Sequence, residues 1–138
     1  MQIKDFLFCD DIRAEIGNKH SLMGVYGDEL NFASQPGKPV KWPMNKPLGL
    51  FIKLIIDDSD IFDSIKMKFS MDNYDTRLPE VNMPIDASKI TKRQINLVTK
   101  MEPLHIPGPG KLVVYLSFLK QGNILETICD ISLDINER

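Results

Sequence analysis

KLVVYLSFLKQGNILETICDISLDI, residues 111–135, carries the clearest structural signal in the chain. Its first part, Lys111 to Leu119, is rich in β-branched and aromatic residues and is apolar on both faces, which is typical of a central strand. In its last part every second residue falls on one apolar face: Leu125, Thr127, Cys129, Ile131, Leu133 and Ile135. This alternation predicts a strand with one buried side. Gly122 can adopt the positive φ of a tight turn, so the sequence predicts a β-hairpin here.

Similar short apolar runs, separated by turns, fill the rest of the chain. Leu48 to Ile56 and Ile65 to Met71 alternate in the same way, on either side of an aspartate-rich turn. Further elements are expected as strands at residues 6–9, 21–26, 30–33, 81–85 and 95–101, and as a short helical turn at residues 86–90. Such a pattern predicts one domain, residues 1–138, that is an all-β, immunoglobulin-like antiparallel β-sandwich of seven to nine strands. A small closed barrel is the alternative.

Charge and hydropathy bear on the class of partner. Seventeen Lys and Arg stand against nineteen Asp and Glu, and neither half of the chain is basic. We therefore expect no nucleic-acid partner bound through a basic face. No apolar run approaches the roughly 18 residues of a membrane span, so no membrane partner is expected. The first residues lack the basic start, apolar region and cleavage site of a signal peptide, which predicts a cytoplasmic protein.

The two cysteines, Cys9 and Cys129, both lie in strand-like patterns among apolar neighbours. Free cysteine behaves as a small hydrophobic residue, and the cytoplasm is reducing. We therefore expect two buried, reduced thiols. A disulfide between them would require the two terminal strands to lie side by side.

The opening FLFCDDIR, residues 6–13, followed by Glu15, Gly17, Lys19 and SLMGVY, residues 21–26, resembles the start of an uncharacterised bacterial family of small domains of unknown function. The segment IPGPGKL, residues 106–112, and the Gly122 turn are similar to that family's closing hairpin. The resemblance covers only these two parts of the chain. It implies a bacterial, cytoplasmic protein with a β-sandwich, and it implies no known activity, so no catalytic residue carries over.

Four residues, Asp10, Asp11, Arg13 and Glu15, form the densest polar group in a strand-like region. One interpretation is a polar site whose acids have shifted pKa values. The other is a structural pairing, in which Arg13 bridges neighbouring strands and Asp10 accepts hydrogen bonds from backbone amides. No nucleophile or second acid stands at a spacing known for catalysis, so the structural pairing is favoured and no enzymatic activity is expected.

A proline-rich stretch, residues 38–47, contains Lys38, Lys41, Trp42 and Lys46. A tryptophan flanked by cations can stack on a base or anchor a protein interface. Alternatively, Trp42 covers an open end of the core and the prolines stiffen the connection. The structural interpretation is favoured, yet these four residues remain the best candidate for a recognition surface.

Acidic residues crowd one loop at Asp57, Asp58, Asp60 and Asp63. Calcium binds six to eight oxygen ligands and often takes them from such loops. The spacing lacks the glycine and the closing glutamate of an EF-hand, so a solvated turn is favoured over a metal site. His20 and His105 stand at no zinc or catalytic-triad spacing, and neither a metal nor a cofactor is expected.

Taken together, these patterns predict a non-enzymatic binding or assembly module with an unknown protein partner. Binding is expected at an exposed sheet edge or at the Trp42 segment. The alternative is a C2-like, calcium- or membrane-dependent module that uses the Asp57–Asp63 loop, and a cryptic hydrolase is a third hypothesis. The sequence leaves the oligomeric state open.

Overall fold

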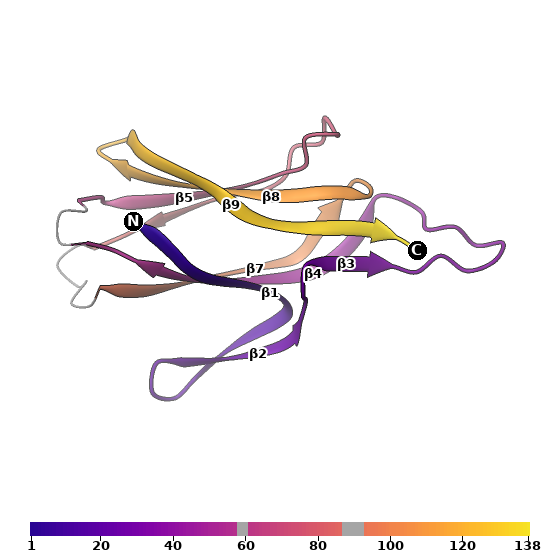
Figure 1. Cartoon of the computed structure of the whole chain (residues 1–138), viewed down its shortest axis with the longest axis horizontal. Coiled ribbons are helices and arrows are strands. Elements are labelled where there is room, and N and C mark those ends of the chain that lie inside the picture. Colours follow the sequence, from indigo (N-terminus) through magenta and orange to yellow (C-terminus); the bar gives the residue numbers. More distant parts are fainter. Residues whose placement is uncertain (58–60, 87–92) are drawn as a thin grey trace.

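The structure is a computed structural model that describes residues 1–57, 61–86 and 93–138. In these residues it has nine strands in two sheets (Figure 1). Sheet A has the order β2-β1-β4-β7, with β1 (Gln2–Glu15), β2 (Lys19–Val25), β4 (Met44–Ile55) and β7 (Gln94–Ile106). Sheet B has the order β3-β9-β8-β5-β6, with β3 (Glu29–Phe32), β5 (Ser64–Ser70), β6 (Glu80–Pro84), β8 (Gly110–Lys120) and β9 (Asn123–Glu137). Most of the expected helical turn, residues 87–90, lies outside the described residues.

The predicted immunoglobulin-like sandwich is confirmed. Every strand pair is antiparallel except β3 with β9, which run parallel from Glu29 opposite Asp134 to Phe32 opposite Glu137. The chain therefore leaves sheet A after β2 and joins the edge of sheet B through β3. The described residues contain no helix with the length and apolarity to cross a membrane.

The core lies between the two sheets and is built from the alternating residues of their central strands. β4 contributes Leu48, Leu50, Ile52 and Leu54, β5 contributes Ile65, Met67 and Phe69, and β8 contributes Leu112, Val114, Leu116 and Phe118. The hairpin predicted between β8 and β9 is present, and Gly122 has the expected positive φ of 80°. Several strands are longer than the alternation predicted, notably β1, β4 and β7.

A β-bulge interrupts the pairing of β8 with β9. Ile128 pairs with Leu116 and Ile131 pairs with Val114, so two residues of β9 lie opposite the single residue Tyr115. A second register shift lies nearer the hairpin turn. Because side chains alternate along a strand, one extra residue reverses which of them face the core.

Because of the bulge, the prediction of which side chains face inward is wrong for the first half of β9. Downstream of it, the side chains predicted to face inward are buried, namely Ile131, Leu133 and Ile135. Upstream, Leu125 and Thr127 are exposed, and Ile128 packs against the core in their place. Cys129 is exposed as well, so the prediction of two buried thiols is wrong for Cys129 and confirmed for Cys9. Both cysteines are free, and they lie in different sheets.

The β1–β2 hairpin forms a partial third layer on the outer face of sheet A, below the sandwich in Figure 1. Cys9, Ile12 and Leu22 of this hairpin pack against Phe51, which lies on the outer face of β4. Gly49 allows the close approach, because a Cβ at this position would lie 2.9 Å from Cγ1 of Ile12. A small apolar cluster, separate from the main core, therefore fixes the hairpin to the sheet.

Candidate functional site

The predicted polar group begins with Asp10, at the junction between the hairpin and the sandwich. Its carboxylate accepts a hydrogen bond from the hydroxyl of Tyr26 and lies 3.2 Å from Nζ of Lys46 on β4. Gly24, with φ of 65°, leaves room for this carboxylate, since a Cβ there would collide with it. The hydrogen bond from Tyr26, and then the contacts with Lys46, hold the pKa of Asp10 below its usual value despite partial burial.

The pKa values of the two partners of Asp10 are raised rather than lowered. Burial raises the pKa of Tyr26, and the hydrogen bond to Asp10 raises it further. Burial alone would lower the pKa of Lys46, but its hydrogen bonds to Tyr26 and Asp10 outweigh that effect and raise it. The pKa of each of the three groups is thus moved further from neutral pH. An acid or base in catalysis, by contrast, works best with a pKa near the working pH. The geometry is that of a structural ion pair.

Asp11 and Arg13 belong to a second set of contacts, which reaches β7. One carboxylate oxygen of Asp11 lies 3.0 Å from Nζ of Lys100, and the other lies 3.6 Å from Nε of Arg13. Lys100 also lies 3.4 Å from Glu102. The hydrogen bond from Lys100 lowers the pKa of Asp11, and the same bond raises the pKa of Lys100. These pairs tie the hairpin to the far strand of sheet A.

Glu15 does not join either set. Its carboxylate accepts a hydrogen bond of 3.0 Å from the hydroxyl of Ser21, near the tip of the hairpin. Of the four predicted residues, Asp11 and Arg13 therefore meet one another, while Asp10 and Glu15 bind elsewhere.

Trp42 lies beside the last residues of β3 and β9, and these two strands end at the right of Figure 1. Its half-buried ring meets Phe32 edge to face at 5.1 Å, and its indole N–H donates to Glu137 at 3.3 Å. Lys38 and Lys41 are exposed beside it. Lys46, the fourth residue of the predicted recognition surface, lies instead on β4 with Asp10. Trp42 thus covers the core, and its polar edge is already bonded.

The acidic loop is described only in part, because Asp58 and Asp60 lie outside the described residues. The carboxylate of Asp63 accepts a hydrogen bond of 2.9 Å from the backbone N–H of Gln121 and so supports the β8–β9 turn. In the described part of the chain, no three His, Cys, Asp or Glu side chains gather where they could hold a metal ion. His20 packs against Phe51, and His105 forms a hydrogen bond with Asn45.

Sequence reasoning did not locate a groove that opens along one side of the sandwich, between the first halves of β1 and β9. β2 pairs only with Cys9–Glu15 of β1, and β3 pairs only with Asp134–Glu137 of β9. Among the described residues, the remaining parts of both strands have a neighbouring strand on one side only. Two adjacent hollows, of about 490 and 500 Å³, lie between these open edges and share Asp5 and Phe6, and together they make up the groove.

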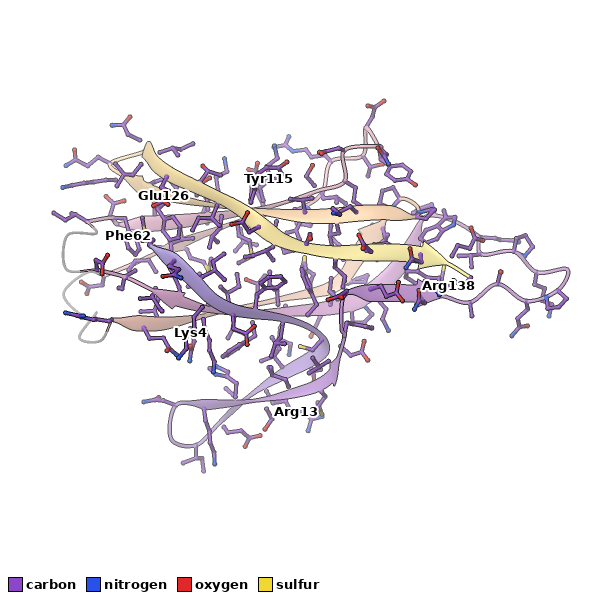
Figure 2. The ribbon with its side chains drawn as sticks, in the orientation of Figure 1. Lys4, Arg13, Phe62, Tyr115, Glu126 and Arg138 are labelled. Carbon is purple, nitrogen blue, oxygen red and sulfur yellow. The ribbon has the colours of Figure 1, made fainter. Side chains whose placement is uncertain are left out.

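The groove has an apolar floor and an acidic rim. Ile3, Phe6 and Ile128 are half-buried in its floor and pack against the core. Five carboxylates line it, from Asp5, Asp28, Glu126, Asp130 and Asp134. Figure 2 labels Glu126 on β9 and Lys4 on β1, the two strands that border the groove. Alternation alone did not reveal this groove, because its extent depends on where β2 and β3 stop pairing.

Comparison of the chain with protein-family models, with curated proteins and with solved structures gives no match. The polar clusters, the Trp42 segment and the groove are the candidate functional surfaces of the described residues. Of these three, only the groove combines unpaired strand edges with accessible apolar surface.

Proposed function

We propose that this chain is a non-enzymatic binding or assembly module of a bacterial cytoplasm, and that a protein partner adds an extended strand along the open edge of β9. The observation that carries the proposal is this edge. β9 spans 15 residues, yet β3 covers only Asp134–Glu137 on the side away from β8. Unpaired strand edges are templates for strand addition, in which backbone hydrogen bonds supply affinity and side-chain pockets supply specificity.

The polar clusters support a binding role over a catalytic one. Asp10 and Asp11 are held in ion pairs at the surface, and their lysine partners have raised pKa values. Such groups stay charged through the neutral range and serve to fix the hairpin.

Two further observations support the cellular setting. Cys9 and Cys129 are both free thiols, which suits a reducing compartment. The resemblance of residues 6–13 and 21–26 to the start of an uncharacterised bacterial family agrees with the same setting.

The edge is a better binding surface than the Trp42 segment. Trp42 already packs on Phe32 and donates to Glu137, so a partner would have to displace existing contacts. The groove beside β9 has an accessible apolar floor and needs no such rearrangement.

Selection from a displayed library of random short peptides tests the proposal. We expect enriched peptides to shift the amide NMR signals of residues 124–133, and to lose binding when alternate peptide amides are N-methylated, since that removes the donors of a β-ladder. Ser132→Pro, which removes a backbone donor from the edge, should weaken the same peptides. If no peptide is enriched, or if the enriched peptides tolerate N-methylation, the proposal is wrong.

A further inference from the structure

We propose that the strand received by the β9 edge is cationic, with Lys or Arg alternating with apolar residues. This inference rests on the proposed strand addition and specifies the chemistry of the partner. The whole chain has a net charge of −2, so a local excess of acid beside the groove would direct the choice of partner.

The acidic rim of the groove is poorly neutralised. Within residues 1–57, 61–86 and 93–138, no salt bridge joins Asp28, Asp130 or Asp134 to a lysine or arginine, although Lys111 of β8 lies opposite Asp134 in the strand register. Lys4, the lysine beside the groove, donates to the side chain of Gln94 on β7 at 3.3 Å and so turns away from β9. The terminal amine lies 4.0 Å from Glu126. The rim therefore presents more negative than positive charge to an incoming segment.

Cationic and apolar side chains should alternate in the partner because one face of β9 is acidic and the other is apolar. Asp130 and Asp134 are exposed beside the groove, while Ile131 and Leu133 are buried and Ile128 packs against the core. A strand added alongside β9 places successive side chains on opposite faces. Its outward side chains would lie beside Asp130 and end next to Asp134, where the pairing with β3 begins, and its inward side chains would meet the apolar floor.

The backbone indicates pairing with β9 rather than with β1. On β1, the N–H of Phe6 already donates to the carboxylate of Asp5 at 2.8 Å, and the carbonyl of Phe8 already accepts from the N–H of Tyr26 at 2.8 Å. On β9, the N–H of Asp134 donates to the carbonyl of Asp28 at 3.0 Å. Because backbone groups alternate along a strand, those of Ser132, two residues upstream, point to the same open side.

A second copy of the chain is a poor occupant of this edge. Pairing of two β9 edges would bring the acidic rims of the two copies together, and like charges placed opposite one another are destabilising. The bulge opposite Tyr115 also twists the edge and limits a long continuous ladder. A cationic segment does not meet the first of these obstacles, and a short one needs no long ladder.

The test compares three blocked peptides of about eight residues, in which Val alternates with Lys, with Gln or with Glu. Affinity is measured by calorimetry at low ionic strength, and the site is located from amide NMR shifts. We expect the Lys–Val peptide to bind most tightly, to shift residues 124–133, and to weaken when salt is added. Asp130→Asn combined with Asp134→Asn should weaken it by about three- to tenfold.

Asp72→Asn combined with Asp75→Asn is the matched control, because it removes the same charge from the exposed loop after β5. Equal weakening by both pairs of substitutions would overturn the inference, as would shifts confined to residues outside the groove.

If the Gln–Val or Glu–Val peptide binds as tightly as the Lys–Val peptide, the cationic preference is wrong while strand addition stands. If none of the three binds at about 1 mM, the inference fails, and the library selection then decides whether any strand is accepted. Self-association of the chain through residues 124–133 would also overturn it.

Discussion

Cys9 and Cys129 differ sharply in their surroundings although both are free thiols. Burial raises the pKa of Cys9, and the neighbouring carboxylates of Asp10 and Asp11 raise it further, so its reactive thiolate is disfavoured. Cys129 lies exposed at the bulge of β9. We expect a thiol reagent at about pH 8 to modify Cys129 rapidly, and Cys9 only when the protein unfolds.

The substitution Cys129→Ser checks this assignment, because it should remove the rapid phase and leave the slow phase unchanged. Cys9→Ser should do the opposite. A rapid phase that survives Cys129→Ser would contradict the exposed position of this residue.

The packing of the β1–β2 hairpin on sheet A depends on the absence of a side chain at Gly49. In Gly49→Ala the new Cβ would lie 2.9 Å from Ile12 and 3.1 Å from Cys9, so the hairpin has to move outward. Overpacking of this kind costs about 1–3 kcal/mol, and we expect urea denaturation to show a loss of that size in the free energy of unfolding.

Gly27→Ala is the control, since a Cβ at Gly27 meets no atom within 4 Å. It should change the free energy of unfolding by no more than about 0.5 kcal/mol. Equal losses for the two variants would show that the contact with Ile12 is not what makes Gly49 necessary.

The ion pair between the hairpin and β4 makes part of the stability depend on pH. The pKa of Asp10 is lowered in the folded protein, so its contribution is complete above its unfolded pKa of about 3.9 and is lost as the pH falls through the folded value. Asp10→Asn should therefore be less stable than the wild type at neutral pH, by less than about 1 kcal/mol because the carboxylate is half-exposed. The urea midpoints of the two proteins should converge on acidification, and a constant difference at every pH would contradict this explanation.

At the scale of elements, the alternation predicted which segments form strands and that β8 and β9 form a hairpin, but not the strand order or where pairing slips or stops. The β8–β9 hairpin was predicted from residues 111–135, yet the bulge opposite Tyr115 leaves no mark in the alternation of β9 itself. Asp10 and Asp11 were identified as candidates from their density alone. Their partners Lys46 and Lys100 come from distant strands, and that pairing depends on how the hairpin folds over sheet A.

Across the whole molecule, Trp42 closes one end of the space between the two sheets. Trp42→Ala removes its contact with Phe32 and its bond to Glu137, and we expect a loss of about 2 kcal/mol, less than for a fully buried tryptophan. Trp42→Phe keeps the ring contact and loses only the N–H donor, so it should cost about 1 kcal/mol. Thermal and urea denaturation measure the loss in the free energy of unfolding for both variants.

The same variants separate the two candidate recognition surfaces. Folded Trp42→Ala should bind the Lys–Val peptide within about twofold of the wild type, since the proposed site lies along β9 and not at this end. Loss of peptide binding in a folded Trp42→Ala protein would move recognition to the Trp42 segment.

The parallel pairing of β3 with β9 has a consequence for biosynthesis. Residues 29–32 emerge from the ribosome long before their partners at residues 134–137 exist, so sheet B cannot be completed during most of translation. Contacts of such long range make folding slow, and they leave strand edges exposed in the meantime. The nascent chain therefore spends that interval with β3 unpaired, at the stage when a chaperone or a premature partner would meet it.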